Sequence, residues 1–186
     1  MLNLNFNPFP VLVTERLILR QLNVGDVQTL MILRSDERVN EFIDRPKTLT
    51  IEDVKTFIEK INQGIADNQS IYWAITLKNN PALIGTICCW NIDILHDTGE
   101  IGYELRPEFQ GKGIMLEAIS EVIDFCFGVM KLKIITALPK KENKRSIQLL
   151  LKRDFQLDAD YKFISRQDAG DLLVYYLSKS PVSISH

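Results

Sequence analysis

The sequence predicts a mixed α/β (α+β) fold, in which helices flank a mixed, mostly antiparallel sheet. Two apolar strand-like runs, residues 71–77 and 83–92, are separated by the turn signal Asn79-Asn80-Pro81, which favours an antiparallel pair. A run that begins at Thr50 repeats apolar residues at helical spacing. The strand-like run at residues 98–105 is followed by a loop, a helix and a further strand, which is the pattern of a parallel crossover. We therefore expect the element order β-α-α-β-β-β-α-β-α-β-β.

The first part of the chain is expected to supply one strand and two helices. Residues 14–22 (TERLILRQL) are strand-like, and residues 24–34 form a short helix. In the second helix, Thr50 and Asp53 resemble a capping box that places an acid in the first turn. The apolar face of this helix consists of Ile51, Val54, Phe57, Ile58, Ile61 and Ile65.

The remaining elements surround a glycine-containing loop. A strand at residues 98–105 leads through the loop into a helix, which turns inward Met115, Ile119, Val122, Ile123 and Cys126. The next strand, residues 132–137, is expected to run parallel to the strand before the loop. A helix at residues 144–153 and two strands, roughly residues 155–159 and 172–178, complete the fold. Ligands of such open sheets bind at the carboxyl ends of strands, where this loop lies.

Length and composition limit the classes of function. The 186 residues fit one domain, 1–186, with an ordered core of about residues 10–180. The net charge of -2 shows no electrostatic footprint for nucleic acid, and no apolar run approaches the ~20 residues that span a membrane. The three cysteines include no CxxC, so we expect no metal and no disulfide framework. Buried-looking thiols and the lack of a signal peptide favour the cytoplasm.

The loop Gln110-Gly111-Lys112-Gly113-Ile114-Met115 has the composition of a phosphate cradle. A dinucleotide fingerprint needs a third glycine, and Leu116 occupies that position. A Walker loop needs Ser or Thr after Gly-Lys, and Gly113 stands there instead. The pattern Gln/Arg-x-x-Gly-x-Gly/Ala of coenzyme A loops fits except at its last position, Met115. Glycines would let backbone N–H groups close around a pyrophosphate at a helix N-terminus; the alternative is a loop that merely joins a strand to a helix.

A second motif, Asn143-Lys144-Arg145-Ser146, lies one strand downstream and ends in Lys152-Arg153-Asp154-Phe155. With the loop, it resembles the GNAT superfamily of acetyl-CoA-dependent N-acetyltransferases. TERLILRQL and GEIGYELRPEFQGKGIMLEA are similar to the branch that acetylates N-terminal alanines of ribosomal proteins. Three positions depart from the family pattern. Asp154 replaces a glycine at a position that commonly takes a left-handed conformation, Met115 replaces Gly or Ala, and Glu104 replaces a large apolar residue.

The resemblance implies direct transfer of an acetyl group from acetyl-CoA to a primary amine, with a peptide or protein N-terminus as the favoured acceptor. The alternatives are a small amine, such as an antibiotic or a polyamine, and a catalytically silent coenzyme A-binding module. No nucleic acid or membrane partner is expected, and the chain is expected to be a monomer or a homodimer. Coenzyme A-binding positions carried over from the family are Leu105, Arg106, Gln110, Gly111, Lys112, Gly113, Ile114, Met115 and Asn143.

Two residues are the catalytic candidates. Glu100 would take the proton of the amine directly or through water, with Glu104 as a rival on the same strand face and His96 as a weaker candidate in a loop. Ser146 would act on the departing thiolate, because the helix lacks the tyrosine that many relatives carry. Its alternative role is to cap that helix, for which Asn143 is the rival. A backbone N–H at the splayed end of strand 98–105 would stabilise the carbonyl oxygen.

Two further groups of residues are candidates for the margins of the site. A basic set could bind the 3′-phosphate of coenzyme A or an acidic substrate, although a solvated loop is favoured for most of its members, Lys140, Lys141, Lys144 and Arg145. Aromatic residues could line an acceptor groove, but such residues in strands more often belong to the core; they are Phe42, Tyr72, Trp73 and Trp90.

Overall fold

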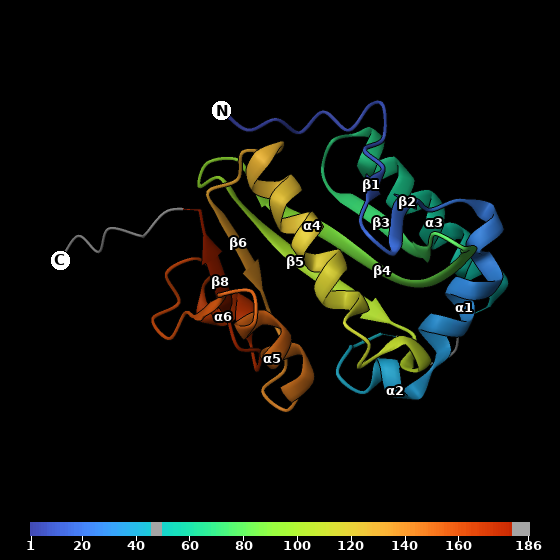
Figure 1. Ribbon diagram of the computed structural model, residues 1–186. Coiled ribbons are helices and arrows are strands. Elements are labelled where there is room, and N and C mark those ends of the chain that lie inside the picture. Colours follow the sequence, from blue (N-terminus) through green and yellow to red (C-terminus); the bar gives the residue numbers. More distant parts are fainter. Residues whose placement is uncertain (46–49, 180–186) are drawn as a thin grey trace.

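A computed structural model of the chain describes residues 1–45 and 50–179. An eight-stranded sheet has the spatial order β1-β2-β3-β4-β5-β6-β8-β7, and its neighbours are antiparallel except for the parallel pair β5–β6. The strands are β1 (Leu12–Val13), β2 (Leu17–Gln21), β3 (Ile71–Leu77), β4 (Asn80–Asp93), β5 (Thr98–Leu105), β6 (Ile134–Ala137), β7 (Gln156–Leu157) and β8 (Tyr175–Ser178). The predicted mixed, mostly antiparallel sheet is confirmed (Figure 1).

Among the described residues, six α-helices accompany the sheet: α1 (Val27–Ser35), α2 (Glu37–Asn40), α3 (Ile51–Ala66), α4 (Ile114–Gly128), α5 (Lys144–Leu151) and α6 (Arg166–Ala169). The predicted capping box of α3 is confirmed, because Thr50 Oγ1 accepts from the N–H of Asp53 while the Asp53 carboxylate accepts from the N–H of Thr50. Within the described part of the chain, no helix combines the length and apolar character needed to cross a membrane.

The structure adds three short elements that were not predicted and shortens others. The expected strand 14–22 is replaced by β1 and β2, because Thr14 closes a turn by accepting the N–H of Leu17 on its hydroxyl. The one-turn helices α2 and α6 are too short to show a helical repeat, and only their capping residues, Asp36 and Ser165, indicate them. The two expected C-terminal strands are reduced to β7 and β8.

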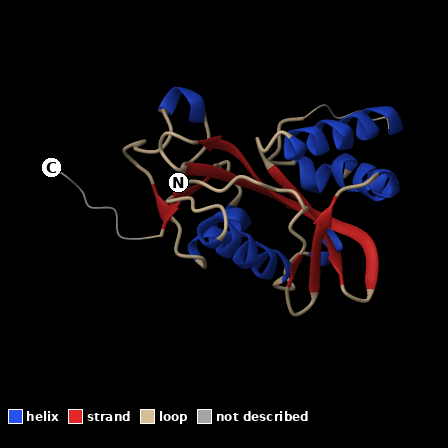
Figure 2. Cartoon of the chain, turned by 90° about the horizontal axis from the view of Figure 1, so that it is seen from above, coloured by secondary structure: helices blue, strands red, loops and turns tan. Residues whose placement is uncertain are grey.

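Helices cover both faces of the sheet (Figure 2). Neighbouring residues of β3 show which helix lies on which face, because successive side chains of a strand point to opposite sides. The Tyr72 ring packs edge-on against Phe57 of α3, with 5.8 Å between centroids. The Trp73 ring packs edge-on against Phe125 of α4, with 5.4 Å between centroids. The core therefore has one layer between the sheet and α3 and another between the sheet and α4.

The parallel pair β5–β6 separates partway along its length. Pairing ends at Glu100 and Thr136, whereas β5 continues to Leu105. On its other side, β5 stays paired with β4, and the Arg106 N–H donates to the Ile84 carbonyl at 2.9 Å. Hydrogen-bonded pairs in an antiparallel ladder recur at every second residue. The N–H groups of the odd-numbered residues after Glu100 therefore point into the opening between the two strands.

Candidate active site

The carboxyl end of β5 borders a cleft of about 1070 Å³. Four segments line it: α2 with the residues that follow it, the end of β5, the loop into α4, and α5 with the residues before it. The segments that carry the two sequence motifs, QGKG and NKRS, thus face one cavity although about 30 residues separate them. This is the position at which open sheets of this type bind ligands.

The two glycines of the QGKG loop present backbone to the cleft. Gly111 and Gly113 have φ values of 73° and 74°, a left-handed conformation that glycine adopts without strain. Gly113 is also the N-cap of α4 and offers no side chain to its first N–H groups. Those groups and the positive end of the helix dipole favour an anion at this point. Ile114 and Met115 are buried behind the loop and contribute to the cleft wall.

Gln110 connects the two sides of the cleft. Its Nε2 donates to the carbonyl of Leu105 at 2.9 Å, which ties the loop to the end of β5. Its Oε1 accepts from Arg145 Nη1 at 3.0 Å, which ties the loop to α5. Gln110, Leu105 and Arg145 all line the cleft. The predicted binding residue Gln110 is therefore held by contacts within the protein at both ends of its amide.

In the second motif, Asn143 and Ser146 have different roles. The Asn143 side chain caps α5, because its Oδ1 accepts from the N–H of Ser146 at 3.0 Å. The Ser146 hydroxyl does not cap the helix and lies 2.8 Å from the hydroxyl of Tyr103. Burial raises the pKa of Tyr103 to about 12, while the hydrogen bond with Ser146 opposes this shift. A hydroxyl pair that keeps its protons at neutral pH therefore faces the cleft.

Glu104 lines the cleft as part of a buried polar cluster. Its carboxylate forms an ion pair with Arg45, lies 3.8 Å from Arg34 Nη1, and accepts from Thr86 Oγ1 at 3.3 Å. Arg34 in turn stacks on the Phe57 ring, with 3.9 Å between the guanidinium carbon and the ring centroid. Burial, followed by repulsion from Arg45, lowers the pKa of Arg34. Two guanidinium groups thus compensate one carboxylate.

Glu100 does not line the cleft but occupies the point where β5 and β6 separate. Burial raises the pKa of its carboxyl, and hydrogen bonds from the side chains of Asn91 and Trp90 oppose this shift. The bond from Asn91 Nδ2 to Glu100 Oε2 is 2.9 Å long. The structure therefore gives Glu100 a partly desolvated carboxyl at the inner end of the strand opening.

Other predicted residues lie outside the cleft lining. Lys112 points its side chain toward the Phe109 ring, and Arg106 forms an ion pair with Glu108. His96 is exposed and pairs with Asp93, with 2.6 Å between Nδ1 and Oδ2. The basic set divides, because Lys144 and Arg145 line the cleft whereas Lys140 and Lys141 do not. Of the aromatic candidates only Phe42 lines the cleft, since Tyr72 and Trp73 are core residues and Trp90 is exposed.

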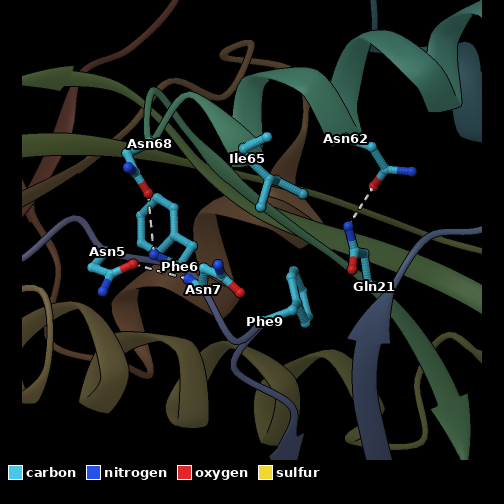
Figure 3. A pocket seen from close by; sticks show the side chains of 9 residues that line it. Asn5, Phe6, Asn7, Phe9, Gln21, Asn62, Ile65 and Asn68 are labelled. Carbon is cyan, nitrogen blue, oxygen red and sulfur yellow. Dashed lines mark hydrogen bonds between the residues drawn. The ribbon is translucent and has the colours of Figure 1, made fainter.

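A second hollow, of about 380 Å³, lies between the N-terminal segment and α3 (Figure 3). Amides dominate its wall, and they hold the chain in place. Gln21 Nε2 donates to Asn62 Oδ1 at 3.0 Å, and the Phe6 N–H donates to Asn68 Oδ1 at 3.1 Å. None of its lining residues carries a titratable side chain, so this hollow lacks groups for proton transfer. No cluster of potential metal ligands occurs among residues 1–45 and 50–179.

The geometry agrees with a comparison against protein families. Residues 16–156 match the family described as "Acetyltransferase (GNAT) domain". The chain belongs to the GNAT acetyltransferase family. The uncharacterized N-acetyltransferase YoaA of Bacillus subtilis is 33% identical over 148 residues, which are 80% of this chain and 84% of that protein. A spermidine N(1)-acetyltransferase of Vibrio cholerae is 25% identical over 137 residues, which are 73% and 76% of the two chains.

Solved structures of GNAT proteins share the fold of this acetyltransferase. Mycobacterium smegmatis RimJ, in complex with CoA-disulfide, superposes with a TM-score of 0.80 at 16% identity, covering 95% of this chain and 90% of its own. The ribosomal-protein-S5-alanine acetyltransferase of Vibrio fischeri superposes with a TM-score of 0.75 at 24% identity, covering 94% and 99%. At these identities the likeness concerns the fold.

Sequence reasoning missed two contributors to this GNAT cleft. Tyr103 sits in an alternating strand, where nothing in the local pattern distinguishes a residue facing a cleft from one facing the core. The segment of α2 and its following residues adds Arg38, Val39, Glu41 and Ile43 beside the predicted Phe42, but it shows no helical repeat. Its only sequence signal is Asp36, whose side chain accepts from the N–H of Arg38 and caps the turn.

Proposed function

We propose that this enzyme uses acetyl-CoA to acetylate the N-terminal amine of a peptide or protein, in the cytoplasm. One observation supports the proposal above all: a glycine cradle at a helix N-terminus and the open edge of β5 lie in the same cleft. The cradle supplies N–H donors for a pyrophosphate, and the open edge supplies N–H donors for amide and thioester carbonyl groups.

The residues of the cleft fit coenzyme A. Gly111 and Gly113 present backbone without Cβ atoms, so a pyrophosphate can approach closely. Lys144, Arg145 and Lys152 line the same cleft and can neutralise phosphate charge. When bound, acetyl-CoA supplies the acetyl group as a thioester. The Oδ1 of Asn143 accepts the hydrogen bond that caps α5, so its Nδ2 is the group that can donate to the cofactor.

Each group of the site has a task in the proposed transfer. Glu100 accepts the proton of the acceptor amine through water, since it lies beyond the cleft wall, and its raised pKa suits a general base. The amine nitrogen then forms a bond to the thioester carbonyl carbon. The N–H groups of β5 that face the opening stabilise the oxygen, which gains negative charge. When the carbon–sulfur bond breaks, Ser146 donates its proton to the thiolate, and the serine oxygen takes back the surplus proton of the newly acylated nitrogen, while Tyr103 holds the serine hydroxyl in place.

The acceptor end of the cleft favours a peptide over a polyamine. A polycation would be recognised by several uncompensated acids, yet of the acids that line the cleft Glu104 is balanced by Arg34 and Arg45 and Glu142 is paired with Lys141, which leaves Glu41. The neighbouring wall is partly apolar, with Val39, Phe42 and Ile43, which suits the side chains of a peptide. The S5-alanine acetyltransferase of Vibrio fischeri, by its name, also acts on a protein.

The proposal is tested by incubating the protein with acetyl-CoA and either Ala- or Ser-starting peptides, spermidine or an aminoglycoside, followed by mass spectrometry. We expect the peptides to gain one acetyl group. Acetylation of the small amines alone would refute the peptide acceptor. Binding of coenzyme A without any turnover would instead indicate a catalytically silent module.

The cofactor is tested separately by calorimetric titration of coenzyme A. Gly113→Val should abolish binding, because a branched residue at a φ of 74° is strained and its Cβ would lie 3.5 Å from Nη2 of Arg16, so the loop would leave its observed conformation. Gly128→Ala, at the far end of α4 where a Cβ meets nothing within 4 Å, is the matched control and should bind normally. Unchanged affinity of Gly113→Val would refute the cradle assignment.

A further inference from the structure

We infer that Arg16, at the start of the chain's sheet, is a positioning residue for the coenzyme A cradle. The inference rests on the proposed function, because it concerns how that cradle is held in its binding conformation. Arg16 does not line the cleft, so its role is indirect.

Arg16 fastens the outer side of the cradle. Its Nη1 donates to the carbonyl oxygen of Lys112 at 3.0 Å. Its Nε donates to Glu117 Oε2 at 2.6 Å, and its backbone N–H donates to Glu117 Oε1 at 2.8 Å. The hydroxyl of Thr14 also donates to Glu117. The turn before β2 is thus joined both to the loop and to the first turn of α4, about 100 residues away.

The contact with Lys112 determines the orientation of one peptide unit. In a planar trans peptide, the C=O of one residue and the N–H of the next point in opposite directions. The Lys112 carbonyl is held by Arg16, outside the cleft, while Gly113 lines the cleft. The N–H of Gly113 is consequently turned away from Arg16, to the side where a pyrophosphate would bind. Glycines on both sides of Lys112 give this peptide unit little intrinsic preference, so an external contact is needed to fix it.

Glu117 fixes the position of the Arg16 guanidinium by accepting its hydrogen bond. Its carboxylate lies in the first turn of α4, and the N–H of Glu117 donates to the carbonyl of Gly113 at 3.1 Å. The Arg16 side chain is 46% exposed, so water can replace its guanidinium, whereas the Glu117 side chain is only 17% exposed but keeps the Thr14 hydroxyl and the Arg16 N–H as donors. Pairs of this kind contribute little to the free energy of unfolding. Loss of Arg16 should therefore affect the affinity for coenzyme A more than it affects stability.

The test compares Arg16→Met with Arg20→Met. Both substitutions remove a guanidinium from β2 or the turn before it, but Arg20 pairs with Asp26, and neither Arg20 nor Asp26 lines the cleft. We expect Arg16→Met to raise the Kd of coenzyme A and the KM of acetyl-CoA roughly tenfold. A change of this size corresponds to the loss of one well-placed hydrogen bond to a charged group. The kcat and the acceptor KM should stay within twofold of the wild type. Arg20→Met should lower the Tm and leave the Kd of coenzyme A unchanged.

A conservative variant sharpens the result. Arg16→Lys keeps the positive charge but lacks the forked donors that contact Glu117 and Lys112 together, so its Kd should also rise. An Arg16→Met protein that binds coenzyme A as tightly as the wild type would overturn the inference and leave the proposed function intact. A wild-type protein that does not bind coenzyme A would overturn both.

Discussion

The hydroxyl oxygen of Tyr103 on β5 lies 2.8 Å from that of Ser146 on α5. This pair joins the two sides of the cleft near the carboxyl end of β5, and Asn143 leaves Ser146 free for it by taking over the cap of α5. Burial holds the pKa of Tyr103 at about 12, so the pair keeps both protons at neutral pH. It is therefore suited to give a proton to a leaving group rather than to accept one.

Ser146→Ala is expected to lower kcat about 100-fold, the usual effect of losing a general acid, with little change in the KM of acetyl-CoA. Tyr103→Phe should lower kcat less, because the serine proton remains. The two substitutions should be non-additive, since they act on one hydrogen bond. Steady-state kinetics of both single variants and the double variant provides the measurement. Full additivity would show that Tyr103 and Ser146 do not act as a unit.

Glu100→Gln should reduce kcat strongly and remove its rise with pH. A general base must be ionised, and burial raises the pKa of Glu100, so the acidic limb of the wild-type profile should lie above the ordinary value of 4.5. Whereas Glu100→Gln should lower kcat, it should raise the stability of the folded protein. A raised pKa in the folded state means that the protonated form is favoured by folding, and this stabilisation is lost as the pH rises through that pKa.

Glutamine resembles the protonated acid, so at neutral pH the Glu100→Gln protein should unfold at a higher temperature than the wild type. Glu142→Gln is the control, since Glu142 is an acid that lines the cleft and should change neither property. Wild-type activity with an unchanged pH profile in Glu100→Gln would exclude Glu100 as the base.

Glu104→Leu should destabilise the protein by about 3–5 kcal/mol, because it leaves the guanidinium groups of Arg34 and Arg45 buried without their carboxylate. Adding Arg45→Leu should restore much of this loss, since one unpaired charge is then removed. Urea unfolding of the two variants measures both changes in the free energy of unfolding. If the double variant were less stable than Glu104→Leu, the uncompensated charge of Arg45 would not be the cause of the loss.

Asp154→Gly should stabilise the protein by roughly 1 kcal/mol. Asp154 follows α5 with a φ of 62°, a left-handed conformation that costs an L residue about 1–2 kcal/mol relative to glycine. The N–H of Asp154 donates to the carbonyl of Leu151 at 3.1 Å, and this bond does not depend on the side chain. Thermal unfolding provides the measurement. A lower Tm for Asp154→Gly would reveal a stabilising role of the carboxylate itself.

The sequence predicted those structural features that depend on residues close to one another in the chain. The antiparallel pairing of β3 with β4, the capping box at Thr50 and the left-handed residue at Asp154 are local, and the structure confirms them, although Asn80 and Pro81 of the predicted turn belong to β4. The proximity of the QGKG and NKRS motifs followed from the parallel crossover between β5 and β6. Contacts between distant segments were not predictable. Tyr103 meets Ser146 across 43 positions, and Arg16 meets Lys112 across 96, and no local periodicity encodes either meeting.

The early end of pairing between β5 and β6 also has a consequence for the behaviour of the protein in solution. An unpaired strand edge is a template for pairing with other chains and commonly leads to aggregation. Here the edge beyond Glu100 faces the interior of the cleft, opposite α5, and is not on the outer margin of the sheet. The fold thereby shelters from intermolecular association the same peptide groups that it offers to a narrow, extended ligand.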